Sequence, residues 1–259
     1  MLINFKLREL NRVTPFGQEN DQHIHWFALT DGDLWFRFGE STVYEYTKEA
    51  VELFADGSSN HVDYYIARFL EDFAELANSI AEPVPEALHS YIGSYRSLLD
   101  FEQRADKWLD QFDGDEFNLN YSGLLSWMNK RLLYSGHLEG GPLIWFFRTG
   151  KEIAIIWKAD NQIAPGQNRW TSTHGQFRMD YPEFVNEAEL FGKLFFEAMY
   201  NQVDQALKKD WGKIRLNKAG LKTDHTQRKK EFATALEYLK SKIKEPENWN
   251  LVLELVKRL

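Results

Sequence analysis

The first fifty residues carry short runs in which apolar and polar positions alternate. INFKLREL, which begins at Ile3, has the period of two that a half-buried strand requires. Two aromatic-rich runs follow, HIHWFALT at 23–30 and DLWFRFG at 33–39, and the turn residues of the DGD segment separate them. This pattern predicts a β-hairpin. STVYEYT at 41–47 adds a third strand to the same meander.

From His61 the apolar period changes to that of a helix. Apolar residues recur at intervals of three and four as far as the EPVP segment, where the prolines end the helix. A second helix is predicted from this segment to Asp113, with Asp106, Asp110 and Asp113 on its outer face. A shorter helix covers LLSWMNKRLLY and ends in the turn residues SGHLEGGP.

Strand patterns return in the second half of the chain. LIWFFRTG and KEIAIIWKAD predict a second hairpin, GQFRMDY a further strand, and the remainder three helices at 183–207, 224–243 and 247–258. Strands and helices do not alternate strictly, so we expect an α+β fold in which antiparallel hairpins or a meander pack against several amphipathic helices, with a helical C-terminal region. We expect a single composite domain over 1–259, with sub-parts 1–136 and 137–259.

Composition narrows the class of protein. The chain has 259 residues, of which 43% are hydrophobic, and the nine Trp, eleven Tyr and nineteen Phe can fill a sizeable core. It has no Cys, which excludes disulfides and thiolate chemistry. The start, MLINFKLREL, lacks the apolar run of a secretory signal, and the longest apolar stretches fall far short of the roughly 20 residues that span a bilayer. We expect a cytoplasmic protein that does not enter a membrane.

The net charge of −8 is unevenly distributed. Acidic residues outnumber basic ones sixteen to four between Glu49 and Glu116, whereas basic residues outnumber acidic ones twelve to four between Lys208 and Lys244. Charge runs of this kind commonly keep helices soluble. An acidic face also attracts and orients a basic partner. The predicted partner contacts are the outward-facing carboxylates Asp63, Glu71, Glu75, Asp106, Asp110 and Asp113.

His23 and His25 are the candidate metal ligands, because side chains two apart on a strand point to the same face. The other histidines and carboxylates lack metal-like spacing, and Trp26 and Phe27 favour a packed hairpin instead. We therefore expect neither a metal nor a cofactor. The nucleotide and hydrolase motifs GxxxxGK, GxGxxG, HExxH and GxSxG do not occur either.

The basic C-terminal region is the candidate for contacts with phosphates. Its cationic residues are Lys208, Lys209, Lys213, Arg215, Lys218, Lys222, Arg228, Lys229 and Lys230. The acidic part of the chain would repel the same nucleic acid, so pairing of these residues with acidic groups of the body is the favoured interpretation.

Five segments together carry a resemblance that spans nearly the whole chain: HWFALTDGDLWFRFG, VDYYIARFLEDF with EPVP, IWFFRTGKEIAIIW, FVNEAELFGKLFFEAM and IRLNKAGLKTDHTQRKKEFATAL. With them the sequence resembles a family of uncharacterised bacterial proteins classed as a domain of unknown function. The resemblance implies a bacterial protein and supplies no catalytic residues.

Two functions stay open at the level of sequence. The leading hypothesis is a non-enzymatic protein-binding protein, most concretely an immunity-type inhibitor of a basic bacterial toxin that uses the acidic helices. The alternative is a hydrolase-like enzyme with an unrecognised, metal-dependent site in which His23, His25 and a carboxylate such as Asp63 converge.

Overall fold

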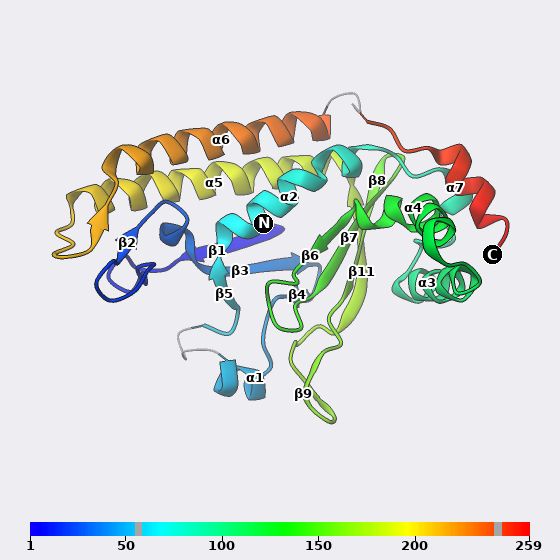
Figure 1. Ribbon diagram of the computed structural model, residues 1–259, viewed down its shortest axis with the longest axis horizontal. Coiled ribbons are helices and arrows are strands. Elements are labelled where there is room, and N and C mark those ends of the chain that lie inside the picture. Colours follow the sequence, from blue (N-terminus) through cyan, green and yellow to red (C-terminus); the bar gives the residue numbers. More distant parts are fainter. Residues whose placement is uncertain (55–58, 241–244) are drawn as a thin grey trace.

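A computed structural model describes residues 1–54, 59–240 and 245–259, and it has the predicted α+β architecture (Figure 1). Its N-terminal sheet contains β1 (Ile3–Leu7), β3 (Asp31–Phe38), β4 (Ser41–Val43) and β5 (Val62–Tyr65), all antiparallel. A second antiparallel sheet has the order β11 (His174–Asp180), β8 (Glu152–Lys158), β7 (Leu143–Thr149) and β6 (Leu132–Tyr134). Two small pairs complete the strands: β9 (Gln162–Ala164) with β10 (Gln167–Asn168), and β2 (His23–Ile24) in parallel with β12 (Arg215–Leu216).

The helices lie on both sides of the second sheet. They are α1 (Lys48–Phe54), α2 (Ile66–Ala81), α3 (Tyr95–Leu109), α4 (Gly114–Asn129), α5 (Tyr181–Lys208), α6 (Lys218–Lys240) and α7 (Trp249–Val256), with short 3₁₀ turns η1 (Ala28–Thr30) and η2 (Glu86–Leu88). Helix α6 runs back along α5 on one side, while α3, α4 and α7 gather at the opposite end of the molecule (Figure 1).

The central strands of the second sheet, β7 and β8, are buried on both faces and separate two hydrophobic cores. Ile144 and Phe146 of β7 belong to the first core, which contains the N-terminal sheet with α2, α5 and α6. The alternate residues Trp145 and Phe147 belong to the second core, with α3, α4 and α7. A strand with two buried faces needs apolar residues at every position, which explains the uninterrupted run LIWFF. Both cores contain residues from before and after position 136, where the two predicted sub-parts of the chain meet.

The predicted hairpin of 23–39 is wrong. Of the first predicted strand, 23–30, only His23 and Ile24 are in a strand, and this strand pairs with β12, nearly two hundred residues away in the sequence. The DGD segment is not a turn but the start of β3, whose neighbours are β1 and β5. A Cβ atom on Gly32 would lie 2.2 Å from the carbonyl oxygen of Lys6, so this glycine permits close approach of two strands instead of a turn.

Other predictions hold with shifted boundaries. The β7–β8 hairpin forms around Gly150, whose φ of 77° lies in the left-handed region that glycine adopts without strain. The helix expected directly after EPVP begins only at Tyr95, where Ser94 and Ser97 form a reciprocal cap. Helix α6 begins at Lys218, six residues before the predicted start, and positions 241–243 of that prediction lie outside the described residues.

Within the three described ranges, no helix combines the length and the apolar character that crossing a bilayer requires.

The shared sheet predicts that the two cores unfold together. Phe146→Ala empties a site in the first core and Phe147→Ala one in the second, and each should lower the free energy of unfolding by about 3–5 kcal/mol. In denaturant, both variants should still show one transition by far-ultraviolet circular dichroism and tryptophan fluorescence. The exposed control Leu119→Ala should change the free energy of unfolding by less than about 0.5 kcal/mol. Two separate unfolding transitions would contradict cooperative unfolding of the two cores through their shared sheet.

Candidate functional site

The structure does not bring the six predicted partner contacts onto one surface. Asp63 lies on β5 in the N-terminal sheet, and Glu71 and Glu75 lie on α2. Asp106, Asp110 and Asp113 lie on α3 or between α3 and α4. Helix α2 packs on α6 and on strands of the first core, whereas α3 packs on α4 and on β8 and β11 of the second sheet. The acidic residues therefore fall into three separate places.

Asp63 is engaged by an arginine of its own chain. The Nε atom of Arg8 lies 2.9 Å from Asp31 Oδ2, and the other end of the guanidinium binds the carboxylate of Asp63. Because these residues come from or flank β1, β3 and β5, the ion pairs join three neighbouring strands. Asp63 therefore stabilises the sheet through this ion pair, and Arg8 compensates its negative charge.

Asp31 and Asp33 point to the same face of β3 and have the properties that acid–base chemistry requires of a carboxyl group. Burial raises the pKa of Asp31, against the opposing charge of Arg8. Burial also raises the pKa of Asp33, against a hydrogen bond from Ser59. The cavity beside Asp33 measures only about 70 Å³, however, whereas substrate pockets occupy roughly 300–1,000 Å³. The cluster has space for water and not for a substrate.

Glu71 and Glu75 line a groove between α2 and α6. Glu71 binds the guanidinium of Arg228 from α6, so the expected pairing of the basic region with the acidic body occurs at this position. The side chain of Glu75 is exposed and has no ion pair in the described part of the chain. Only one of these two carboxylates therefore remains available.

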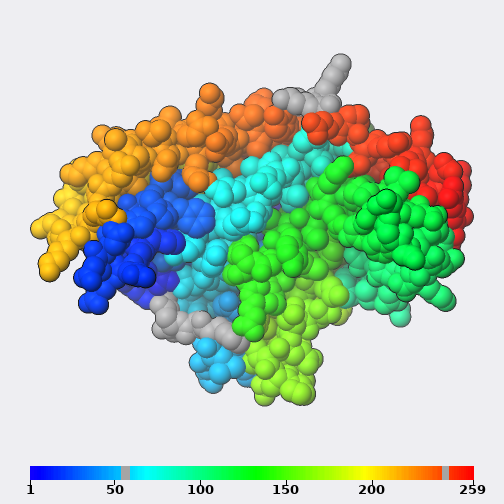
Figure 2. Space-filling view, viewed as in Figure 1, coloured from blue at the N-terminus to red at the C-terminus, as the bar shows by residue number. Residues whose placement is uncertain are grey.

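Asp106, Asp110 and Asp113 form an exposed acidic end of the molecule together with Asp115 and Glu116 of α4. None of the five makes an ion pair with another described residue. Asp113 occupies the cap position of α4 without a side-chain capping bond, so its carboxylate is not used to hold the helix. The helices α3 and α4 lie with α7 at the right of Figure 1 and Figure 2.

Aromatic and aliphatic side chains lie among the carboxylates of the acidic end. Trp108 and Phe112 make an edge-to-face contact at 4.7 Å, and the rings of Phe117 and Tyr121 stack at 5.9 Å. Leu119 is 69% exposed and Tyr121 38% exposed, although both are large apolar residues. Exposed apolar groups of this kind, surrounded by charge, are typical of protein-binding surfaces.

His23 and His25 lie together, as the strand spacing predicts, with their ring centroids 5.5 Å apart. Phe16 packs against His25 at 4.5 Å, and the backbone N–H of Ala28 donates to His25 Nδ1 at 3.3 Å. Burial and the neighbouring His23 lower the pKa of His25. Among the described residues, no group of three or more His, Cys, Asp or Glu side chains is placed to hold a metal ion. The arrangement is one of aromatic packing.

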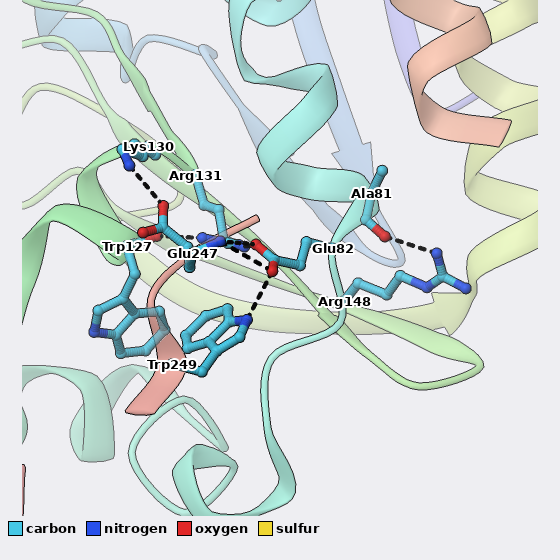
Figure 3. A network of polar contacts seen from close by, with 8 residues as sticks. All are labelled: Ala81, Glu82, Trp127, Lys130, Arg131, Arg148, Glu247 and Trp249. Atoms are coloured by element: carbon cyan, nitrogen blue, oxygen red, sulfur yellow. Dashed lines mark hydrogen bonds and ion pairs between the residues drawn. The ribbon is translucent and has the colours of Figure 1, made fainter. Parts of the chain in front are cut away.

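The most deeply buried charges form a network that the sequence analysis missed (Figure 3). Arg131 donates from one terminal nitrogen to Glu82 at 3.0 Å and from the other to the Trp127 carbonyl at 2.7 Å. Glu82 also accepts from Trp249 Nε1 at 2.8 Å and from the backbone N–H of Glu247. These bonds attach the segment that leads into α7 to the ends of α2 and α4.

No local signal in the sequence indicates this network. Glu82 sits in the helix-breaking EPVP segment and Arg131 in an amphipathic helix pattern, and forty-nine residues separate them. The sequence pattern indicates two exposed charges, whereas in the structure both residues are buried. Burial lowers the pKa of Arg131, while the carboxylates of Glu82 and Glu247 favour its charged form.

The model of a family of unknown function, DUF5984, matches residues 2–255. The chain belongs to this family. Neither a curated protein nor a solved structure matches it. The resemblance inferred from the sequence segments is therefore confirmed, and family membership itself assigns no activity.

The buried ion pair should respond strongly to removal of one partner. Arg131→Met leaves Glu82 charged and poorly compensated in the interior, so the free energy of unfolding should fall by about 3–5 kcal/mol. The double variant Glu82→Gln/Arg131→Met should lose less than the sum of the two single changes, because glutamine still accepts from Trp249. Urea unfolding measures all three. The control Lys208→Met removes an exposed ion pair with Asp204 and should cost no more than about 1 kcal/mol.

His137 should make stability depend on pH. Its ring lies 4.8 Å from those of Tyr64 and Phe69, and both ring nitrogens are buried without a hydrogen-bond partner among the described residues. Burial, assisted by the charge of Arg68, lowers its pKa to about 4. The unfolded chain binds this proton near its ordinary pKa of 6.5, so stability should fall as the pH drops from about 6.5 towards 4.

His137→Phe keeps the aromatic packing and removes the titrating group. Its free energy of unfolding should decline less than that of the unchanged protein between about pH 7 and pH 5, in denaturant titrations at each pH. The other histidines are present in both proteins, so their contributions cancel in the comparison. Equal declines would show that His137 is protonated as easily in the folded state as in the unfolded chain.

Proposed function

We propose that this protein is a non-enzymatic binding protein whose partner is a basic protein. The most concrete case is an immunity-type inhibitor of a basic bacterial toxin. The observation that carries the proposal is the acidic end of α3 and α4, where five exposed carboxylates have no ion pair within the described residues.

Charge density at this end favours a cationic partner. Between Asp100 and Glu116 the chain has seven acidic and two basic residues. Uncompensated charges of one sign raise the rate at which an oppositely charged protein associates, and they do so most at low ionic strength. Asp63 and Glu71 do not contribute to this effect, because arginines of the chain already bind them.

Apolar anchors at the same end supply what charge alone does not. Tight protein interfaces usually depend on a few aromatic or large side chains that become fully desolvated, with polar groups around them. Tyr121 and Leu119 are exposed next to the carboxylates, and Phe112 and Phe117 are partly exposed beside them. The combination supports a specific interface at this end.

Charge reversal tests the proposal. The tagged protein should capture a basic protein from lysate of the source bacterium, identified by mass spectrometry. The variant Asp106→Lys/Asp110→Lys/Asp113→Lys should then associate with this partner about tenfold more slowly or worse at low salt, because the steering charge is inverted. Surface plasmon resonance at two ionic strengths measures the rate.

A matched control separates the position of the charges from the net charge. Glu40→Lys/Glu197→Lys/Glu237→Lys changes the net charge by the same amount at exposed sites elsewhere. It should alter the association rate less than about threefold. Equal effects of the two variants would refute a specific surface on α3, and capture of acidic or neutral proteins only would refute the basic partner.

A further inference from the structure

A second surface outside the acidic end has its own recognition chemistry. Helices α2 and α6 pack along one another, and they lie side by side in the space-filling view, cyan beside orange (Figure 2). The groove between them measures about 270 Å³. Its apolar lining consists of Leu70, Ala74, Phe232 and Ala235.

Carboxylates surround this apolar lining. Glu71 and Glu75 come from α2 and Glu231 from α6, and Arg228 is the one cation among the groove's lining residues. Arg228 is already bound by Glu71. Glu75 and Glu231 are both exposed and have no ion pair within the described residues, although Gln227 donates a hydrogen bond to Glu231 at 2.8 Å. The groove therefore keeps a negative charge beside an apolar surface.

Arg228 shows how this part of the molecule accommodates a guanidinium. Its charged group is held by a carboxylate, and it lies 5.1 Å from the centre of the Trp26 ring. Arginine combines an apolar stem with a planar cation, so it suits a groove that has an apolar floor and carboxylates at its rim. The volume of the groove lies just below the range of small-molecule pockets, which fits one or two side chains of a larger partner.

We propose that the α2–α6 groove docks an arginine-bearing segment of a partner protein. The arginine stem lies on the half-buried Ala74 and Tyr238, above the buried Leu70 and Phe232, and its guanidinium pairs with Glu75 and Glu231. The inference does not rest on the acidic end of α3, because the groove belongs to the first core and uses none of the residues of that end.

A capped peptide tests the groove directly. The probe is the hexapeptide Ala-Leu-Arg-Leu-Arg-Ala, titrated into the ¹⁵N-labelled full chain. The largest chemical-shift changes should fall on amides of α2 and α6 around Ala74 and Ala235. A citrulline analogue has the same shape without the charge and should bind at least about fivefold more weakly. Equal binding of the two peptides, or shifts confined to α3 and α4, would overturn the proposal.

Neutral variants complete the test without disturbing the fold. Glu75→Gln/Glu231→Gln should weaken binding of the arginine peptide about fivefold or more, because both charged acceptors are lost. The control Glu183→Gln/Glu197→Gln removes two exposed charges from α5 and should leave the affinity within about twofold. The variant Asp106→Lys/Asp110→Lys/Asp113→Lys should also still bind the arginine peptide. A negative result for the groove can therefore be told apart from a negative result for the acidic end. Equal losses in the groove and control variants would refute the site.

Discussion

The constraint on which the rest of the structure depends is a four-stranded sheet whose two central strands, β7 and β8, are buried on both faces. Alternate side chains of β7 and β8 enter two different cores, so neither core is complete without the other side of the same sheet. Such a sheet must be covered by helices on both sides, because an exposed face would leave rows of Trp, Phe and Ile in water. This requirement places α2, α5 and α6 on one side and α3, α4 and α7 on the other. The two candidate binding surfaces are therefore separated by the sheet itself.

The Glu82–Arg131 network decides where the C-terminal segment attaches. Transfer of both charges from water costs several kcal/mol per ion, and Trp249, Glu247 and the Trp127 carbonyl offset part of this cost by hydrogen bonding to the pair. The Nε atom of Arg131 is buried without a hydrogen-bond partner among the described residues. An apolar contact has little directional preference, whereas these bonds fix the position of the segment that precedes α7. Helix α7 then contributes Val252, Leu255 and Val256 to the second core. The buried charges thus position the segment more than they add to stability.

Internal ion pairs also decide which acidic residues keep an uncompensated charge. Arg8 and Arg228 each come from parts of the chain that are remote in sequence from the carboxylates they bind, and they compensate Asp63 and Glu71. No comparable cation reaches the acidic end of α3 within the described residues, where Arg104 and Lys107 are outnumbered. The acidic end and the α2–α6 groove differ accordingly. The first combines dense exposed charge with apolar anchors, and the second offers two carboxylates beside an apolar base.

The sequence by itself determined the fold class, most helices and the β7–β8 hairpin, because these depend on local period and turn residues. It also placed Asp106 on the outer face of a helix, since helical spacing fixes orientation within one element. Asp110 and Asp113 are exposed as well, but they lie beyond the end of α3 and not on one continuous helix. The prediction of a hairpin at 23–39 was wrong, because Gly32 permits the close approach of two strands and a glycine of that kind has the same local sequence signal as a turn glycine. Only the tertiary structure decided the partner of β2, the burial of Glu82 and Arg131, and the compensation of Asp63 and Glu71. Each of these depends on contacts between distant segments, and no local pattern encodes which charges such contacts bring together or remove from water.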